Sequence, residues 1–142
     1  MYFIQLTHNF LAAIALAFIL AAVVNSFKGK SEGRVFTAKD RKIALFALIT
    51  THLQLVIGLI LYFMSPKGFA AMHEMKNAAL RLTALEHPLT NIIAVTLITI
   101  GWSTHKKAST DAAKFGKISM FYLIGLLLIL SRMPWNLWFN FN

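Results

Sequence analysis

The sequence contains no cysteine, and this absence excludes several kinds of site at once. Disulfides, iron–sulfur clusters, thiolate-bound zinc and covalently attached c-type haem all depend on cysteine sulfur. Charged residues are also scarce, at 13% of the chain, whereas a soluble domain carries roughly 25%. Hydrophobic residues make up 58%. This composition is not that of a water-soluble globular protein.

Four long apolar segments account for most of the 142 residues. A membrane-spanning helix needs about 20 predominantly apolar residues. The segments that meet this requirement are approximately 3–27, 43–64, 82–104 and 118–135. The first has no basic start and is longer than the core of a signal peptide, so we interpret it as a retained span. The sequence therefore predicts one all-α domain, an integral membrane bundle of four transmembrane helices.

The basic residues, which give a formal net charge of +9, lie mainly in two of the connections between spans. Ten of them are Lys28, Lys30, Arg34, Lys39, Arg41, Lys42, Lys106, Lys107, Lys114 and Lys117. The opposite side has only Lys67, Lys76, Arg81 and Arg132. By the positive-inside rule the ten face the cytoplasm, and both termini lie outside. The pattern predicts a multi-pass membrane protein and no nucleic-acid partner.

The connection between the second and third spans has a helical pattern of its own. Its apolar residues recur at helical spacing: Phe69, Met72, Met75, Ala79 and Leu82. We therefore expect a short amphipathic helix on the membrane surface. The run Met72-His73-Glu74-Met75 offers soft ligands for copper, but methionines at this spacing more commonly anchor such a helix.

Ionisable residues inside a membrane are costly, so each is a candidate for function. The candidates are His8, His52, Glu86, His87 and Arg132, accompanied by Gln54 and Asn91. From the expected span ends, His8 and His87 lie roughly 9 Å below the outer surface, and His52 lies roughly 18 Å below it. His8 and His87 are therefore expected at the same level.

Two level histidines on different helices are what a non-covalent haem b requires, because its iron accepts one imidazole from each side. The helix faces below the two histidines carry small or slim residues: Ala12, Ala15, Ile19 and Ala22 in the first span, and Asn91, Ala94, Ile98 and Gly101 in the third. Arg132, Arg81 and Trp135 are candidate donors to the haem propionates. The same residues also suit a simpler role, since histidine and asparagine form hydrogen bonds between membrane helices.

Three further residues have open or secondary interpretations. Glu86 is expected to orient His87 or to pair with Arg81 or Arg132. Pro88 either starts the third helix or fixes the direction of His87. His105 lies five turns from His87 on the same face and suggests a second haem, but Lys106 and Lys107 favour an ordinary solvated helix end.

Several motifs together resemble small bacterial four-helix inner-membrane proteins labelled cytochrome B or cytochrome b-like. They are Thr51-His52-Leu53-Gln54-Leu55 with Gly58-Leu59-Ile60-Leu61-Tyr62-Phe63, Leu85-Glu86-His87-Pro88, and Ser131-Arg132-Met133-Pro134-Trp135. The resemblance covers nearly the whole chain and implies a bacterial inner membrane, haem b, electron transfer, and ligands among His8, His52 and His87. The second span is also loosely similar to helices in one half of haem A synthase.

The sequence thus predicts an electron-transfer protein that binds haem b through His8 and His87, with His52 as the alternative ligand. Its expected partners are the lipid bilayer, quinone, and other membrane subunits or further copies of the chain. The alternative is a haem-free accessory or assembly subunit whose polar residues only fix helix packing. Catalysis, in a form similar to haem A synthase, is a third possibility, although no nucleophile with a base and no paired carboxylates are present.

Overall fold

The computed structural model describes residues 1–138, and within this range it is helical, with no β-strand. Four helices are long and apolar enough to span a membrane: α1 (Tyr2–Ser31), α2 (Ala38–Met64), the continuous helix Ala78–Lys107, and α5 (Asp111–Ser131). The third consists of α3 (Ala78–Arg81), the π-turn η2 (Leu82–Glu86) and α4 (His87–Lys107). The short α6 (Trp135–Trp138) follows the fourth span. The four predicted spans are confirmed, and the chain is a multi-pass membrane protein.

The helices begin earlier than hydropathy alone indicates, because capping residues set their ends. Thr37 precedes α2, and Asp40 accepts hydrogen bonds from the Thr37 amide at 2.9 Å and its hydroxyl at 3.0 Å. Thr110 caps α5 by accepting from the Ala113 amide at 3.1 Å. Each cap satisfies backbone donors that the first helical turn leaves unpaired. The fourth helix, α5, ends at Ser131, four residues before the approximate end at residue 135 that hydropathy indicates.

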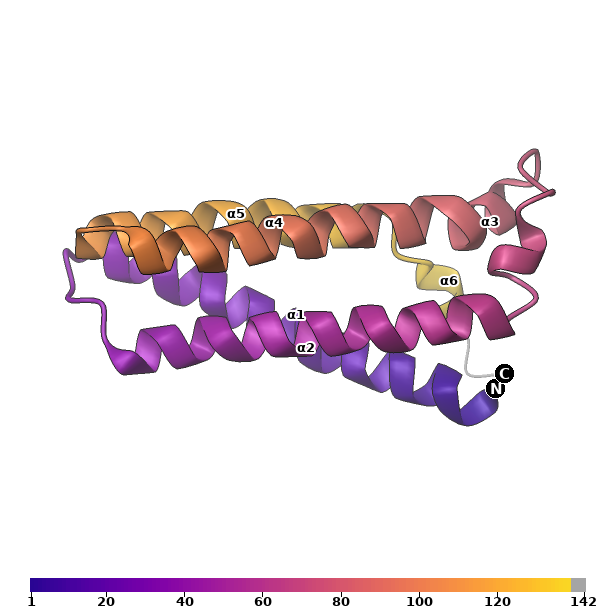
Figure 1. Cartoon of the computed structure of the whole chain (residues 1–142), viewed down its shortest axis with the longest axis horizontal. Helices are drawn as coiled ribbons and strands as arrows, with labels where there is room; N and C mark the ends of the chain where they lie inside the picture. The colour runs from indigo at the N-terminus through magenta and orange to yellow at the C-terminus, as the bar shows by residue number, and fades with distance from the viewer. Residues whose placement is uncertain (139–142) are drawn as a thin grey trace.

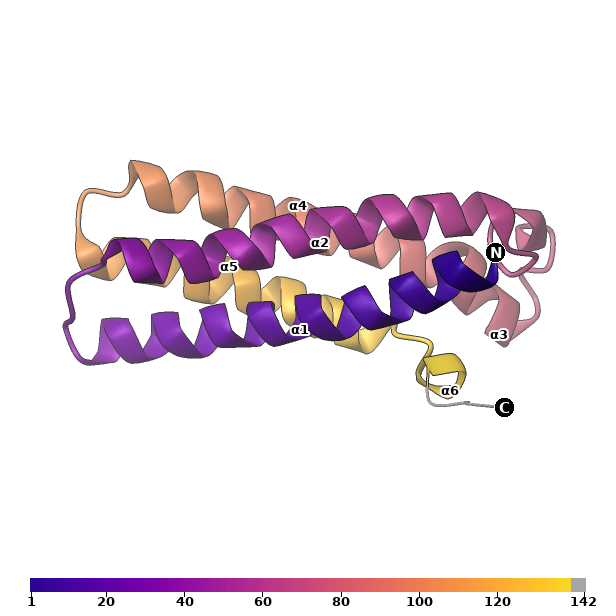
Figure 2. The same cartoon turned by 90° about the horizontal axis from the view of Figure 1, so that it is seen from below.

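The four spans form a ring of neighbours in which α1 contacts α2 and α5, and α4 contacts α2 and α5. Helices α1 and α4 therefore face each other diagonally across the bundle. Figures 1 and 2 show the spans running along the same long axis, with α1 oblique to the others. The buried residues of α1 all lie between Ala12 and Gly29, so its first turns are loosely packed. This divergence leaves space between the helices near the N-terminus.

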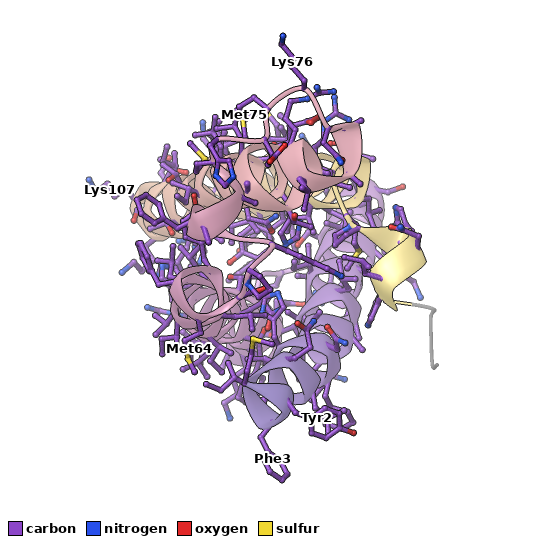
Figure 3. All side chains as sticks on the ribbon, turned by 90° about the vertical axis from the view of Figure 1, so that its right-hand side faces the viewer. Tyr2, Phe3, Met64, Met75, Lys76 and Lys107 are labelled. Atoms are coloured by element: carbon purple, nitrogen blue, oxygen red, sulfur yellow. The ribbon has the colours of Figure 1, made fainter. Side chains whose placement is uncertain are left out.

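Large apolar side chains cover the outside of the bundle. Tyr2 and Phe3 are 71% and 78% exposed, and Figure 3 shows both projecting away from the helices. Further exposed apolar residues occur along all four spans, including Phe10, Phe46, Ile60, Ile93 and Leu127. A soluble monomer rarely exposes apolar surface on this scale, whereas a lipid-facing surface requires it.

The two ends of the bundle differ in charge. The α1–α2 and α4–α5 connections lie together at one end (Figure 1), and the ten basic residues lie in these connections or in the helix ends that adjoin them. The N-terminus, the α2–α3 connection and α6 lie at the other end, called here the terminal end. At the basic end, Arg34 forms an ion pair with the buried Asp40 at 2.9 Å. The expected grouping of loops is therefore confirmed.

The expected amphipathic helix after α2 is wrong. The structure has a single 3-10 turn, η1 (Phe69–Ala71), followed by turns up to Asn77. Gly68 reverses the chain against Tyr62, whose carbonyl oxygen leaves no room for a Cβ atom on Gly68. Asn77 then caps the next helix by accepting from the Leu80 amide. Ala79 and Leu82, assigned to the surface helix by their spacing, belong to the third span instead.

Candidate functional site

The spans enclose a partly open cavity of about 170 Å3 near the terminal end. Its wall includes residues from α1, α2, the third span and the C-terminal arm, which we define as residues 132–138. The lining residues include His8, Ala12, Ala15, Ile19, Gln54, Gly58, Tyr62, His87, Asn91 and Met133. The small face of α1 predicted from the sequence therefore lines a cavity along Ala12, Ala15 and Ile19.

His8 and His87 face each other in this cavity from the diagonal helices α1 and α4. Their ring centroids are 6.4 Å apart, and the ring planes are nearly perpendicular, at 88°. A direct N–H···N hydrogen bond of about 2.9 Å would bring the ring centres to about 5.1 Å. Two metal–nitrogen bonds of about 2 Å, with about 1.1 Å from each nitrogen to its ring centre, give about 6.2 Å. The observed centroid spacing is longer than that of a direct hydrogen bond and close to that of two imidazoles that share one metal ion.

The His87 ring is oriented by its own environment. Its Nδ1 lies 3.0 Å from the carbonyl oxygen of Arg132. Asn91 Nδ2 also lies 3.2 Å from Nδ1. Because a carbonyl only accepts hydrogen bonds, the Arg132 contact favours the tautomer in which Nδ1 carries the proton and Nε2 keeps its lone pair. Asn91 donates from Nδ2 to the His87 carbonyl at 2.7 Å, one turn below. A histidine that donates one ring N–H to a backbone carbonyl and leaves the other nitrogen free has the form of a metal ligand.

His8 is supported from α2 by Gln54 and Gly58. The Gln54 amide donates to the His8 carbonyl at 2.9 Å and lies 3.5 Å from His8 Nε2. A Cβ atom on Gly58 would lie 3.0 Å from His8 Cε1, so glycine provides space for the ring. Nδ1 of His8 and Oε1 of Gln54 are buried without a hydrogen-bond partner in the described part of the chain. Two unsatisfied polar atoms at one place are unusual in a packed interior.

An acidic residue connects the third span with the C-terminal arm. Glu86 accepts from Arg81 at 3.2 Å and pairs with Arg132 at 3.4 Å, so the expected pairing of Glu86 is confirmed with both arginines. This bridge helps hold the Arg132 backbone beside His87. Both guanidinium groups have an anionic partner within the protein, which reduces their availability as donors to a propionate.

His52 is placed away from this cavity. It is exposed on the side of α2 toward α4, where Nδ1 lies 2.7 Å from the Leu48 carbonyl and Nε2 lies 3.3 Å from the Thr99 hydroxyl. Of the other predicted site residues, Gln54 contacts His8, while Asn91 and Arg132 contact His87. The structure thus gathers five of the six predicted residues and separates His52 from them.

Several secondary expectations differ from the structure. His105 is 1% exposed and lies between Phe36 and Trp102 at the basic end, so the expected solvated helix end is wrong. The slim face of α4 below Asn91 packs against α5 instead of the cavity, because Ile98 meets Gly125 and Gly101 meets Phe121. His73 lies 3.3 Å from Glu74 on an exposed turn. No group of three potential metal-ligating residues occurs among residues 1–138.

The donor set at the cavity fits a haem iron. Two imidazoles lie across the cavity with centroids 6.4 Å apart, and the part of the wall that α1 supplies below His8 is small and apolar. The enclosed volume is smaller than the roughly 300–1,000 Å3 of pockets that bury a drug-sized ligand. The cavity is only partly enclosed.

Two residues of the site were not singled out from the sequence. Gly58 and Tyr62 were noted only as parts of a motif, yet Gly58 makes room for His8, and Tyr62 donates to the Ala84 carbonyl at 2.9 Å. Gly58 lies one turn after Gln54, a spacing that indicates a shared helix face. The partner of Tyr62 is 22 residues away, and no local pattern identifies it.

In comparisons with protein-family models, curated proteins and solved structures, no match to this chain was found.

Proposed function

We propose that this membrane protein binds one haem b between His8 and His87 and takes part in electron transfer. The observation that carries the proposal is the 6.4 Å separation of the two ring centroids across a cavity. This distance is too long for a direct hydrogen bond between the rings, and it matches two imidazoles that share one metal ion. The arrangement needs no cysteine, in agreement with the composition.

The chain's own residues have defined roles in this proposal. The Arg132 carbonyl fixes the His87 tautomer, so that Nε2 is the ligating nitrogen. Gln54 and Gly58 position His8. Ala12, Ala15 and Ile19 provide a slim apolar wall on the α1 side of the cavity. Bound haem would supply one-electron redox chemistry at this site.

The proposed partners follow from the surface of the molecule. The described residues form membrane spans with short connections, so the protein would exchange electrons with a quinone in the lipid or with subunits of a larger redox assembly. Its exposed apolar faces suit either another subunit or a second copy of the chain. We place the protein in a bacterial inner membrane, with the basic end cytoplasmic and the haem near the outer leaflet.

The test is an optical spectrum of the full chain, purified in detergent from cells with an ample haem supply. We expect sharp b-type bands in the reduced-minus-oxidised spectrum and about one haem per chain, as two axial histidines require. A colourless protein that also fails to bind added haem contradicts the proposal.

A second candidate function is that of a haem-free accessory or assembly subunit. It is favoured by the small enclosed volume of the cavity, and by the fact that rings 6.4 Å apart at 88° also suit edge-to-face packing. In that case His8 and His87 only stabilise the contact between helices. The same spectrum separates the two functions, because this candidate predicts no haem at any supply.

A further inference from the structure

The third span contains a π-turn directly before His87. The His87 amide donates a hydrogen bond to the Leu82 carbonyl, five residues earlier. In a regular α-helix it would donate to the carbonyl four residues earlier. Such turns are rare, and they occur frequently at functional sites. Pro88 follows immediately and lies ten residues inside the continuous helix Ala78–Lys107, so it does not start the span.

Pro88 accounts for the turn and removes the usual amide donor to one backbone carbonyl. Proline has no N–H to donate to the carbonyl four residues earlier, and its ring collides with that carbonyl in a regular helix. The residue four positions before Pro88 is Ala84, which is 1% exposed. A buried carbonyl without a donor is costly, so another group has to satisfy it.

The missing donor comes from α2. The Tyr62 hydroxyl donates to the Ala84 carbonyl at 2.9 Å. The Tyr62 ring is held against Phe63 and Phe69, at 5.2 Å and 6.3 Å between centroids. The hydroxyl is therefore well placed to tie α2 to the π-turn. The π-turn is closed by the His87 amide. The hydrogen bond from Tyr62 to the turn therefore helps to set the direction of the His87 side chain.

We infer that Tyr62 is a positioning residue for His87, acting through the Ala84 carbonyl that Pro88 leaves without a backbone donor. The inference rests on the proposed function, because it assigns Tyr62 a role in orienting a haem ligand. Tyr62 does not itself contact the iron. Its hydroxyl fixes the π-turn, and the π-turn together with the Arg132 carbonyl fixes the His87 ring.

The test compares four full-length proteins in detergent: the wild type, Tyr62→Phe, Pro88→Ala and the double variant. The first measurement is the 15N NMR signal of the His87 ring in haem-free protein, which reports the Nδ1 hydrogen bond directly. Tyr62→Phe should shift or broaden this signal. In the Pro88→Ala background the same change should have little effect, because the new amide at position 88 supplies a second donor for Ala84.

Tyr122→Phe is the matched control. The Tyr122 hydroxyl also donates to a backbone carbonyl at 2.9 Å, that of Ala44, but within the main core of the bundle. Its removal should leave the His87 signal unchanged. An unchanged His87 signal in Tyr62→Phe, or an equal change with and without Pro88, would overturn the inference.

A second measurement connects the inference with haem. Tyr62→Phe should weaken haem binding about tenfold and alter the low-spin EPR signal, as is usual when the support of a metal ligand is removed. Haem binding that is unaffected by Tyr62→Phe counts against the inference but leaves the proposed function intact. If the wild type binds no haem, the proposed function fails, and the His87 NMR signal still decides whether Tyr62 positions the ring.

Discussion

At the residue scale, Gly58 and Gly116 show how differently two glycines respond to an added methyl group. On Gly58 the Cβ atom would lie 3.0 Å from Cε1 of His8, whose ring is part of the cavity wall. On Gly116 it would lie 3.2 Å from Lys30 Nζ, the far end of a flexible side chain that can move away. Both positions are helical, so alanine improves helix propensity equally at both.

We expect Gly58→Ala to displace the His8 ring and to weaken haem binding about tenfold, because extra volume in a packed site forces side chains to move. Gly116→Ala should bind haem like the wild type. Haem titration of both variants measures the difference. Equal affinities in the two variants would show that the space beside His8 is not used for ligation.

At the element scale, apolar segment length was enough to find the four spans, but it did not locate their ends. Hydropathy identifies the centre of a span, whereas capping residues decide where the helix begins. The pattern Thr37-x-x-Asp40 is a recognisable capping signal, and it places the start of α2 before the expected residue 43. The surface helix was misassigned because Ala79 and Leu82 fit its period as well as that of the third span.

The π-turn could not be foreseen from the sequence, although Pro88 marks its place. A proline near the expected start of a span is ordinary, and only the observed start at Ala78 puts it inside the helix. The compensating donor on Tyr62 belongs to another helix. Pairings of this kind depend on how the helices pack, which a single sequence does not record.

At the scale of the whole molecule, the predicted depths of the histidines were the most informative sequence result. His8 and His87 were expected at one level, and they meet in the structure. His52 was expected deeper, and it lies outside the cavity. Depth follows from span position alone, but the outward direction of His52 depends on the rotation of α2, which the apolar pattern on all its faces does not specify.

The orientation of the molecule in the membrane is tested by reporter fusions. Ten basic residues lie at one end of the bundle and four elsewhere, so that end should remain in the cytoplasm. A reporter that works only in the cytoplasm should be active when inserted at Gly33. A reporter that works only outside the cytoplasm should be active when fused to the C-terminus. Gly33 suits an insertion, since it lies in an exposed turn with open space around it. A cytoplasmic C-terminus would contradict the proposed orientation.

The central claim is that His8 and His87 together hold the haem, and the most direct measurement is the haem content of three single variants. His8→Ala and His87→Ala should each reduce bound haem from about one per chain to less than about a tenth, because each removes one of two axial ligands. His52→Ala should retain haem, since this histidine lies outside the cavity. Helix content by circular dichroism shows that each variant is folded. Loss of haem in His52→Ala, with haem retained in His8→Ala, would contradict the account.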